Sequence, residues 1–478
     1  MYRRVLLPVL TLFLLLGACQ APAGVPVQLS GGGPSPELAD APSAGAADPE
    51  EGLVRFYLAD PGDPSRWIEI DPAELGEGRR CWVADPEGEG DGASYTEVVL
   101  TGVGEDGEYV FVSYPGPDLT QERLNAVLDE VMKDYLATAV SVAVIEDGEV
   151  TVSGAWGWAV KNQREMTADT KVRAASLSKV AVGMSTLSMA EEGLLELDVP
   201  LDTYWGRGVG NAYSEAQPTV YTLMTHTSSL TDQANIDGLA NLRACLQSPY
   251  SWRRMEPGDG DYWYYSNFGF CVLGTTLELA ADQMLEDYLQ SRWLEPLGIR
   301  ASLYSGKLAA DELACLYDDL GRVELSAWDQ IARPVPAGIG DSGSYFPGNL
   351  TISAPDMARL AAVLVNDGSY HGVRYLSPGS VADMETPRFT VDYPDNPWPF
   401  EQCLVLRHQR DLMGRASVYY HTGSAYGVYA LLSYDPEAGD GVVVLTVGAP
   451  YQVNDRGLYT LCADLSGRLY AEMEGNRS

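Results

Sequence analysis

Three short groups of residues in this 478-residue chain have types and spacings suited to nucleophilic chemistry. The first is Ser176 followed three positions later by Lys179, at the start of a segment with helical apolar spacing. Residues three apart share one face of a helix, so the lysine amine can approach the serine hydroxyl. A partly desolvated lysine can lose its proton and act as a base, which arginine cannot do. Taken alone, the pair also fits an exposed lysine beside a capping serine.

The second and third groups add proton-relay and acyl-orienting residues. In Tyr265-Ser266-Asn267, a phenol beside a cationic lysine can relay a proton, and an amide offers a donor and an acceptor to a bound acyl group. The same run also fits an aromatic core segment. In His421-Thr422-Gly423-Ser424, the glycine lets a substrate approach the backbone, and the next N–H can point at an oxyanion.

In this order and over these intervals, the three groups resemble the motifs of the penicillin-binding protein and serine β-lactamase superfamily. The similarity is to its branch of class C β-lactamases, D-alanyl-D-alanine carboxypeptidases and esterases. The segments 192–200, 223–230 and 294–298 resemble the same branch, and the resemblance covers roughly residues 118 to 470.

The resemblance implies an acyl-enzyme mechanism with Ser176 as the nucleophile. Lys179 and Tyr265 would manage its proton, with the division of labour between them left open. The N–H groups of Ser176 and Ser424 would form the oxyanion hole. The residues expected to orient the acyl group and its carboxylate are Asn267, His421 and Thr422.

Two departures from the family pattern affect the expected substrate. The third motif begins with His421 where β-lactamases usually have lysine, and Ser229 stands where glycine is common. A histidine is neutral or cationic near pH 7, so it binds a substrate carboxylate only conditionally. This favours a peptidase or esterase over a β-lactamase. His226, in the family's loop, is expected to be structural and to lie away from the chemistry.

A competing motif, Gly340–Ser344, imitates the nucleophile loop of trypsin-like proteases. That mechanism needs a histidine far upstream of the serine, and no histidine precedes His226. Gly-x-Ser-x-Gly, the α/β-hydrolase signature, is absent. The stretch is therefore expected to be a turn ahead of a helix that begins near Ser353.

The elements that must position these residues follow from apolar spacing. A helix is expected from Leu124 to Leu136 and a hairpin around Asp147-Gly148, and helical patterns dominate from about 176 to 297. Strands return at 429–434 and 442–447, before a last helix over 458–469. This predicts an α/β domain over 118–472: an antiparallel sheet flanked by N- and C-terminal helices, with an inserted all-helical domain, as in serine β-lactamases and transpeptidases. The cleft between them is the expected active site.

The N-terminal part predicts a targeting signal, a tether and a small module. Arg3, Arg4 and an apolar run lead to Leu16-Gly17-Ala18-Cys19, which resembles a bacterial lipobox, so residues 1–19 are expected to be a lipoprotein signal peptide with Cys19 lipid-modified. The alternative is an ordinary cleaved signal. Residues 20–50 are expected to be a flexible linker, and 51–117 a small β module of unknown role.

Composition excludes several other classes. With 67 Asp and Glu against 31 Lys and Arg, the net charge of −36 argues against a nucleic-acid partner. Neither Cys-x-x-Cys nor His-Glu-x-x-His occurs, so no metal or other cofactor is expected, and the acidic stretch 85–97 is expected to be a solvated turn. The six cysteines after Cys19 are compatible with three disulfides or with free thiols.

The sequence therefore predicts a serine hydrolase on the outer side of a bacterial cell membrane. Its expected partners are the membrane, through lipid on Cys19, and a peptidoglycan-type D-amino-acid peptide, a β-lactam or a small ester as substrate. The alternatives within the enzyme class are a class C-like β-lactamase and a small-ester esterase. The alternative outside it is a penicillin-binding surface or sensor lipoprotein without turnover.

Overall fold

The chain divides into two compact units, Met1–Gly116 with Tyr370–Val373, and Pro117–Ser369 with Arg374–Ser478. The computed structural model describes residues 119–477 except 234–235, 237 and 393–398, together with strand residues 12–14, 56–60, 63–70, 80–84, 95–103 and 109–113.

The described strands of the first unit form one antiparallel sheet in the order β1-β6-β5-β4-β2-β3. Their bounds are β1 Leu12–Leu14, β2 Phe56–Asp60, β3 Asp63–Ile70, β4 Arg80–Ala84, β5 Tyr95–Val103 and β6 Tyr109–Ser113. β1 lies within the segment expected to be a signal peptide, whereas Cys19, the expected linker and residues 85–94 of the acidic stretch lie outside the described residues.

The second unit is built on a nine-stranded antiparallel sheet in the part of the chain that the structure describes, in the order β16-β17-β18-β19-β20-β21-β7-β8-β9. Its strands are β7 Ala139–Glu146, β8 Glu149–Val160, β9 Arg164–Glu165, β16 Phe389–Val391, β17 Phe400–Gln402, β18 Arg407–Leu412, β19 Arg415–Ala425, β20 Val428–Asp435 and β21 Asp440–Val447. The expected hairpin turn has positive φ at Asp147 and Gly148, 51° and 78°.

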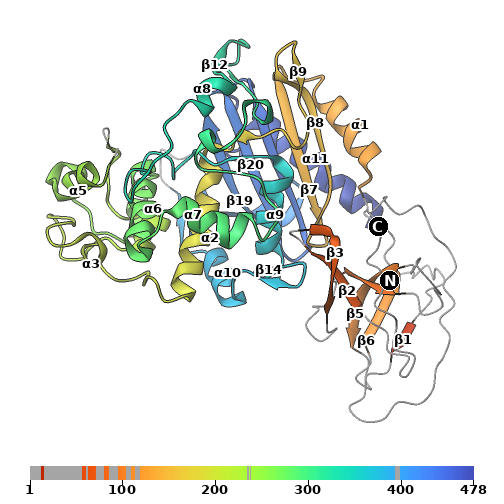
Figure 1. Ribbon diagram of the computed structural model, residues 1–478, viewed down its shortest axis with the longest axis horizontal. Coiled ribbons are helices and arrows are strands. Elements are labelled where there is room, and N and C mark those ends of the chain that lie inside the picture. Colours follow the sequence, from red (N-terminus) through yellow and green to blue (C-terminus); the bar gives the residue numbers. More distant parts are fainter. Residues whose placement is uncertain are drawn as a thin grey trace, which may run out of the picture. The chain divides into compact units, whose positions relative to one another are not determined.

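Helices cover both faces of this sheet. α1 (Gln121–Val131) and α11 (Thr460–Arg477) pack on one face, while α9 (Ala354–Val365) packs against β7, β8 and β21 on the other (Figure 1). α1 ends five residues earlier than its apolar spacing predicts, and Leu136 beyond it is 83% exposed. The residues that α1 and α11 bury on the sheet include Val140, Val142, Val144, Val418, Leu431, Val442 and Val444.

The expected helical insertion is also present. Between β8 and β16 lie α2 Ser178–Glu191, α3 Asp202–Trp205, α4 Val220–Met224, α5 Leu239–Gln247, α6 Asn267–Ala281, α7 Leu285–Leu289, α8 Ala327–Ile331, α9 and α10 Pro378–Glu385. Short strand pairs join β10 (Val172–Arg173) to β13 (Thr351–Ile352), β11 (Leu316–Tyr317) to β12 (Val323–Leu325), and β14 (Ser369–Tyr370) to β15 (Val373–Arg374). The α/β architecture predicted from the sequence is thus confirmed.

Two further findings concern the membrane and the cysteines. None of the described helices combines the length and the apolar character that crossing a bilayer requires. Cys245, Cys315, Cys403 and Cys462 are free thiols, so the three-disulfide alternative is not formed in the described chain.

Candidate active site

Ser176 lies in a single 3-10 turn, Ala175–Leu177, that leads directly into α2. Ala175 before it has φ 49°, a left-handed conformation that is costly for a residue with a side chain. Hydrogen bonds hold this turn in place: the Ser178 hydroxyl donates to the Ala175 carbonyl at 2.7 Å and accepts from the Leu350 N–H at 2.9 Å. The strained turn therefore presents the Ser176 side chain at the start of the helix.

Lys179 is buried, and its amine contacts three oxygen atoms. Its Nζ lies 3.0 Å from Ser176 Oγ, 2.9 Å from Asn267 Oδ1 and 2.7 Å from the carbonyl oxygen of Pro347. The last two can only accept, whereas a hydroxyl can donate or accept. A neutral amine would donate to Asn267 and Pro347 and direct its lone pair at Ser176, so both protonation states of the lysine are satisfied.

The Pro347 carbonyl comes from the turn that includes the competing Gly340–Ser344 motif. Ser342 in that motif is buried and hydrogen-bonded to the Tyr304 hydroxyl, and the stretch forms a turn as predicted. Glu278 of α6 holds the turn, because its Oε2 accepts the Gly340 N–H at 2.8 Å. Burial raises the pKa of Glu278 to about 7. The contact between the Pro347 carbonyl and Lys179 could not be found from the sequence, because every residue has a backbone carbonyl and no residue type marks it.

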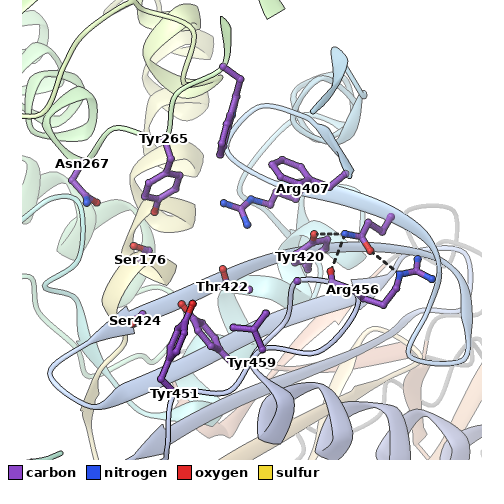
Figure 2. A pocket seen from close by; sticks show the side chains of 15 residues that line it. Ser176, Tyr265, Asn267, Arg407, Tyr420, Thr422, Ser424, Tyr451, Arg456 and Tyr459 are labelled. Carbon is purple, nitrogen blue, oxygen red and sulfur yellow. Dashed lines mark hydrogen bonds between the residues drawn. The ribbon is translucent and has the colours of Figure 1, made fainter. Parts of the chain in front are cut away.

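Tyr265 and Asn267 are positioned by the capped N-terminus of α6. Ser266 caps the helix by accepting from the Gly269 N–H at 2.9 Å. Asp232 Oδ1 in turn accepts from the Ser266 hydroxyl at 2.9 Å and from the Phe268 N–H at 3.0 Å. These bonds direct the Asn267 side chain at Lys179, and Figure 2 shows the Tyr265 hydroxyl turned toward Ser176.

The expectation that His226 would lie away from the chemistry is wrong. Its ring centroid is 4.4 Å from that of Tyr265, and its Nδ1 accepts the Ser266 N–H at 3.3 Å. Burial, followed by the charges of Lys179 and nearby groups, lowers the pKa of His226 well below its usual value. His226 is therefore neutral, and its ring packs against the ring of Tyr265.

Strand alternation divides the third motif between two faces of β19. Thr422 and Ser424 line the cavity beside Ser176, whereas Gly423, on the opposite face of the strand, meets the Ser176 turn, and the His421 ring centroid lies 6.5 Å from that of Tyr265. A Cβ on Gly423 would lie 2.7 Å from the Ala174 carbonyl oxygen, so a side chain there would push the Ser176 turn away from the sheet.

His421, whose contact with substrate stays a prediction, lies next to the catalytic residues, with its ring centroid 6.5 Å from that of Tyr265. It is buried, it is not among the described residues that line the cavity, and its Nδ1 is 2.8 Å from the Thr422 carbonyl oxygen. Burial first, and then the charges of Arg407 and Lys179, lowers the pKa of His421 well below its usual value. The imidazole is therefore neutral near pH 7.

Arg407 of β18 is one of two arginines among the described residues that line the cavity, the other being Arg456, and the sequence analysis singled out neither. The Arg407 guanidinium lies 4.5 Å from the ring centroid of Phe400, 5.8 Å from that of Trp263 and 5.7 Å from that of Tyr265. Figure 2 shows it directed toward Tyr265 and Thr422. No apolar alternation marks the strand Arg407-His408-Gln409-Arg410, so sequence spacing gave no signal for it.

The cavity measures about 360 Å³ and is polar and aromatic. Its lining comprises Ser176, Trp263, Tyr265, Asn267, Phe400, Arg407, Gln409, Tyr420, Thr422, Ser424, Tyr451, Val453, Arg456, Gly457 and Tyr459 (Figure 2). None of these described residues is Asp or Glu, although acidic residues outnumber basic ones 67 to 31 in the chain. In the described part of the chain, no group of three or more His, Cys, Asp or Glu side chains is placed to hold a metal ion.

A serine in contact with a buried lysine, at the start of a helix of the inserted region and beside strand β19 of an antiparallel sheet, defines a serine hydrolase of the penicillin-binding protein and β-lactamase superfamily. The chain belongs to the beta-lactamase family, whose model matches residues 124–464. The sequence-based recognition of this superfamily is therefore confirmed.

Individual relatives are distant. Esterase EstB of Burkholderia gladioli is 29% identical over 285 residues, which cover 52% of this chain and 70% of that protein. A D-aminopeptidase of Brucella anthropi is 29% identical over 228 residues, covering 45% and 42%. The octameric penicillin-binding protein homologue from Pyrococcus abyssi superposes with a TM-score of 0.60 at 21% identity, over 75% of this chain and 78% of that one, which shows a shared fold.

The contact between α6 and the Pro347 turn predicts an effect of substituting Gly274. A Cβ at Gly274 would overlap the buried Phe346 ring, so Gly274→Ala should displace Phe346 and with it the adjacent Pro347 carbonyl from Lys179. We expect the rate of Ser176 labelling by a fluorophosphonate to fall about a hundredfold, the cost of misplacing a reacting group by about 1 Å.

The matched control is Gly269→Ala in the same helix, where the added Cβ meets atoms no closer than 3.5 Å. Its labelling rate should stay within about threefold of the unsubstituted protein. Equal labelling rates in the Gly274 and Gly269 variants would show that the Pro347 turn does not position Lys179.

Proposed function

We propose that this serine hydrolase cleaves amide or ester bonds in D-amino-acid peptides of the peptidoglycan type, through an acyl-enzyme on Ser176. The observation that carries the proposal is the 3.0 Å contact between Lys179 Nζ and Ser176 Oγ. The other two contacts of the amine are with oxygen atoms of Asn267 and Pro347, which can only accept a hydrogen bond from it. Similarity to an esterase and to a D-aminopeptidase supports the choice of ester and amide substrates.

In the proposed reaction, Ser176 Oγ attacks the substrate carbonyl while its proton passes to Lys179 Nζ. The Asn267 and Pro347 oxygens keep the lone pair of the neutral amine directed at the serine. Tyr265, whose ring centroid is 4.9 Å from Lys179 Nζ, would relay the proton to the leaving group. The N–H groups of Ser176 and Ser424 would stabilise the oxyanion, and water would then release the acyl group.

Substitution of Ser176 and Lys179 tests this mechanism. Release of D-alanine from diacetyl-L-Lys-D-Ala-D-Ala should fall at least about a thousandfold in Ser176→Ala. It should fall comparably in Lys179→Arg, because a guanidinium keeps the charge but cannot accept the proton. Ser291→Ala, at an exposed serine that donates to the Asp287 carbonyl, is the control and should retain full activity.

Benzylpenicillin and p-nitrophenyl acetate, followed by intact mass and by absorbance, separate the neighbouring functions. Hydrolysis of penicillin that disappears in Ser176→Ala would make the protein a β-lactamase. Cleavage of the small ester alone would make it an esterase, and a lasting penicillin adduct without peptide turnover would make it a sensor. Full peptide turnover in Ser176→Ala would overturn the proposed nucleophile.

We also propose that Arg407 binds a carboxylate of the substrate. It is a permanent cation that lines the cavity, whereas the His421 imidazole is neutral, buried and not among the described residues that line it. The aromatic rings around Arg407 limit access of water to the guanidinium, which strengthens a charge-assisted hydrogen bond.

Arg407→Ala should therefore lower kcat/KM for acetyl-D-Ala-D-Ala by about 10- to 100-fold, the worth of one hydrogen bond to a charged group. The C-terminal amide of the same peptide should change by less than about threefold, and Arg322→Ala, at an exposed turn arginine, should affect neither peptide.

The pH profile of KM distinguishes Arg407 from His421. With Arg407 as the anchor, KM for the acid should be flat between about pH 6 and 8. A KM that rises with pH would mean that binding is lost as an imidazolium loses its proton, and would assign the carboxylate to His421 instead.

We propose, finally, that the protein works outside the cytoplasm and is attached to the membrane by a lipid anchor at Cys19. The support is the order of basic start, apolar run and Leu-Gly-Ala-Cys at the N-terminus. Full-length protein expressed in a bacterium should sediment with membranes, and Cys19→Ala should leave uncleaved precursor without lipid. An unmodified Cys19 in the mass spectrum of the mature wild-type protein would contradict the anchor.

A further inference from the structure

A second group of nucleophilic and titratable side chains lies on β17, β18 and β19. His408 Nδ1 is 2.6 Å from Glu401 Oε2, and His408 Nε2 is 2.8 Å from Ser417 Oγ. The three residues thus form a continuous chain of hydrogen bonds from carboxylate to imidazole to hydroxyl. None of them takes part in the chemistry proposed at Ser176.

The direction of these hydrogen bonds follows from their chemistry. An ionised carboxylate can only accept, so the bond to Glu401 places the proton of a neutral imidazole on Nδ1. Nε2 then has a free lone pair, and the Ser417 hydroxyl donates to it. This is the order of nucleophile, base and orienting group that activates a serine.

Strand register places the group on one face of the sheet. Glu401 pairs with His408 across β17 and β18, and Arg410 pairs with Ser417 across β18 and β19. Cross-strand partners project from the same face, so the exposed Arg410 is a neighbour of Ser417 on this face. A guanidinium there can stabilise negative charge that develops on an acyl group bound to Ser417.

Burial favours reactivity as well. His408 is only 5% exposed, and its ring lies 4.7 Å from that of Tyr419, which fixes the imidazole. Ser417 is half-buried and the Glu401 side chain is 36% exposed, so small molecules can reach the hydroxyl. The base is therefore desolvated while the nucleophile remains accessible.

This group is separate from the cavity of Ser176. Ser417 is not among the described residues that line that cavity. It precedes Thr422 by five positions on β19, which corresponds to about 17 Å along an extended strand at roughly 3.3 Å per residue.

We propose that Ser417 is a second nucleophilic serine, which accepts acyl groups from small activated esters. In this step a bond forms between Ser417 Oγ and the acyl carbon, and the ester C–O bond breaks. The hydroxyl proton passes to His408 Nε2 and from there to the departing alkoxide. Glu401 holds the imidazolium in the intervening state, and Arg410 faces the developing oxyanion.

The test uses the full-length chain carrying Ser176→Ala, so that the proposed primary nucleophile is absent. The probe is diisopropyl fluorophosphate, with which Ser417 Oγ would form a bond to phosphorus while fluoride leaves and His408 takes the proton. Peptide mapping by mass spectrometry should find the adduct on Ser417. The labelling rate should fall at least about tenfold on adding His408→Gln or Glu401→Gln, and Ser417→Ala should abolish the adduct.

Ser291 provides the internal comparison, because its exposed hydroxyl donates to backbone carbonyls rather than to a histidine. Labelling of Ser291 as fast as Ser417, no adduct on Ser417, or an unchanged rate in both His408→Gln and Glu401→Gln would overturn the proposal. Thermal unfolding of each variant identifies any that fails to fold. If His408→Gln does not fold, Glu401→Gln, at the partly exposed position, still tests the proposal. Because the background lacks Ser176, the result is independent of the proposed function.

Discussion

The buried amine of Lys179 is the constraint on which the rest of the site depends. An ammonium or amine removed from water must be fully hydrogen-bonded, and its three partners come from three distant parts of the chain. Ser176 belongs to a strained turn before α2, Asn267 to the capped start of α6, and the Pro347 carbonyl to a turn tied to Glu278. Packing of these elements around one nitrogen atom is what brings nucleophile and base together.

A second consequence of burying these groups is the state of the neighbouring histidines. His226 and His421 are both buried near Lys179 and Arg407, so an additional positive charge on either ring would be desolvated and repelled. Both rings are therefore neutral and act as packing and hydrogen-bonding groups. The arginine side chains that line the cavity carry positive charge there, because arginine stays charged at any physiological pH.

The pairing of β18 and β19 gives the sheet two different polar surfaces. Arg407 and Tyr420 are cross-strand partners that line the Ser176 cavity. The next pair in the ladder, His408 and Tyr419, projects from the opposite face, where His408 contacts Glu401 and Ser417. Because side chains alternate along a strand, a shift of one residue in this register would exchange the two surfaces.

The sequence by itself determined the local features: the Ser176 to Lys179 spacing at a helix start, the Tyr265 to Asn267 run, and the Asp147-Gly148 hairpin. Each depends on residues a few positions apart, where helical or turn geometry dictates the outcome. Only the tertiary structure decided that Pro347 would contact Lys179, that Arg407 would line the cavity, and that His421 would be buried beside Tyr265. These outcomes depend on which elements cover each face of the sheet, and contacts between residues distant in sequence leave no periodic pattern in the chain.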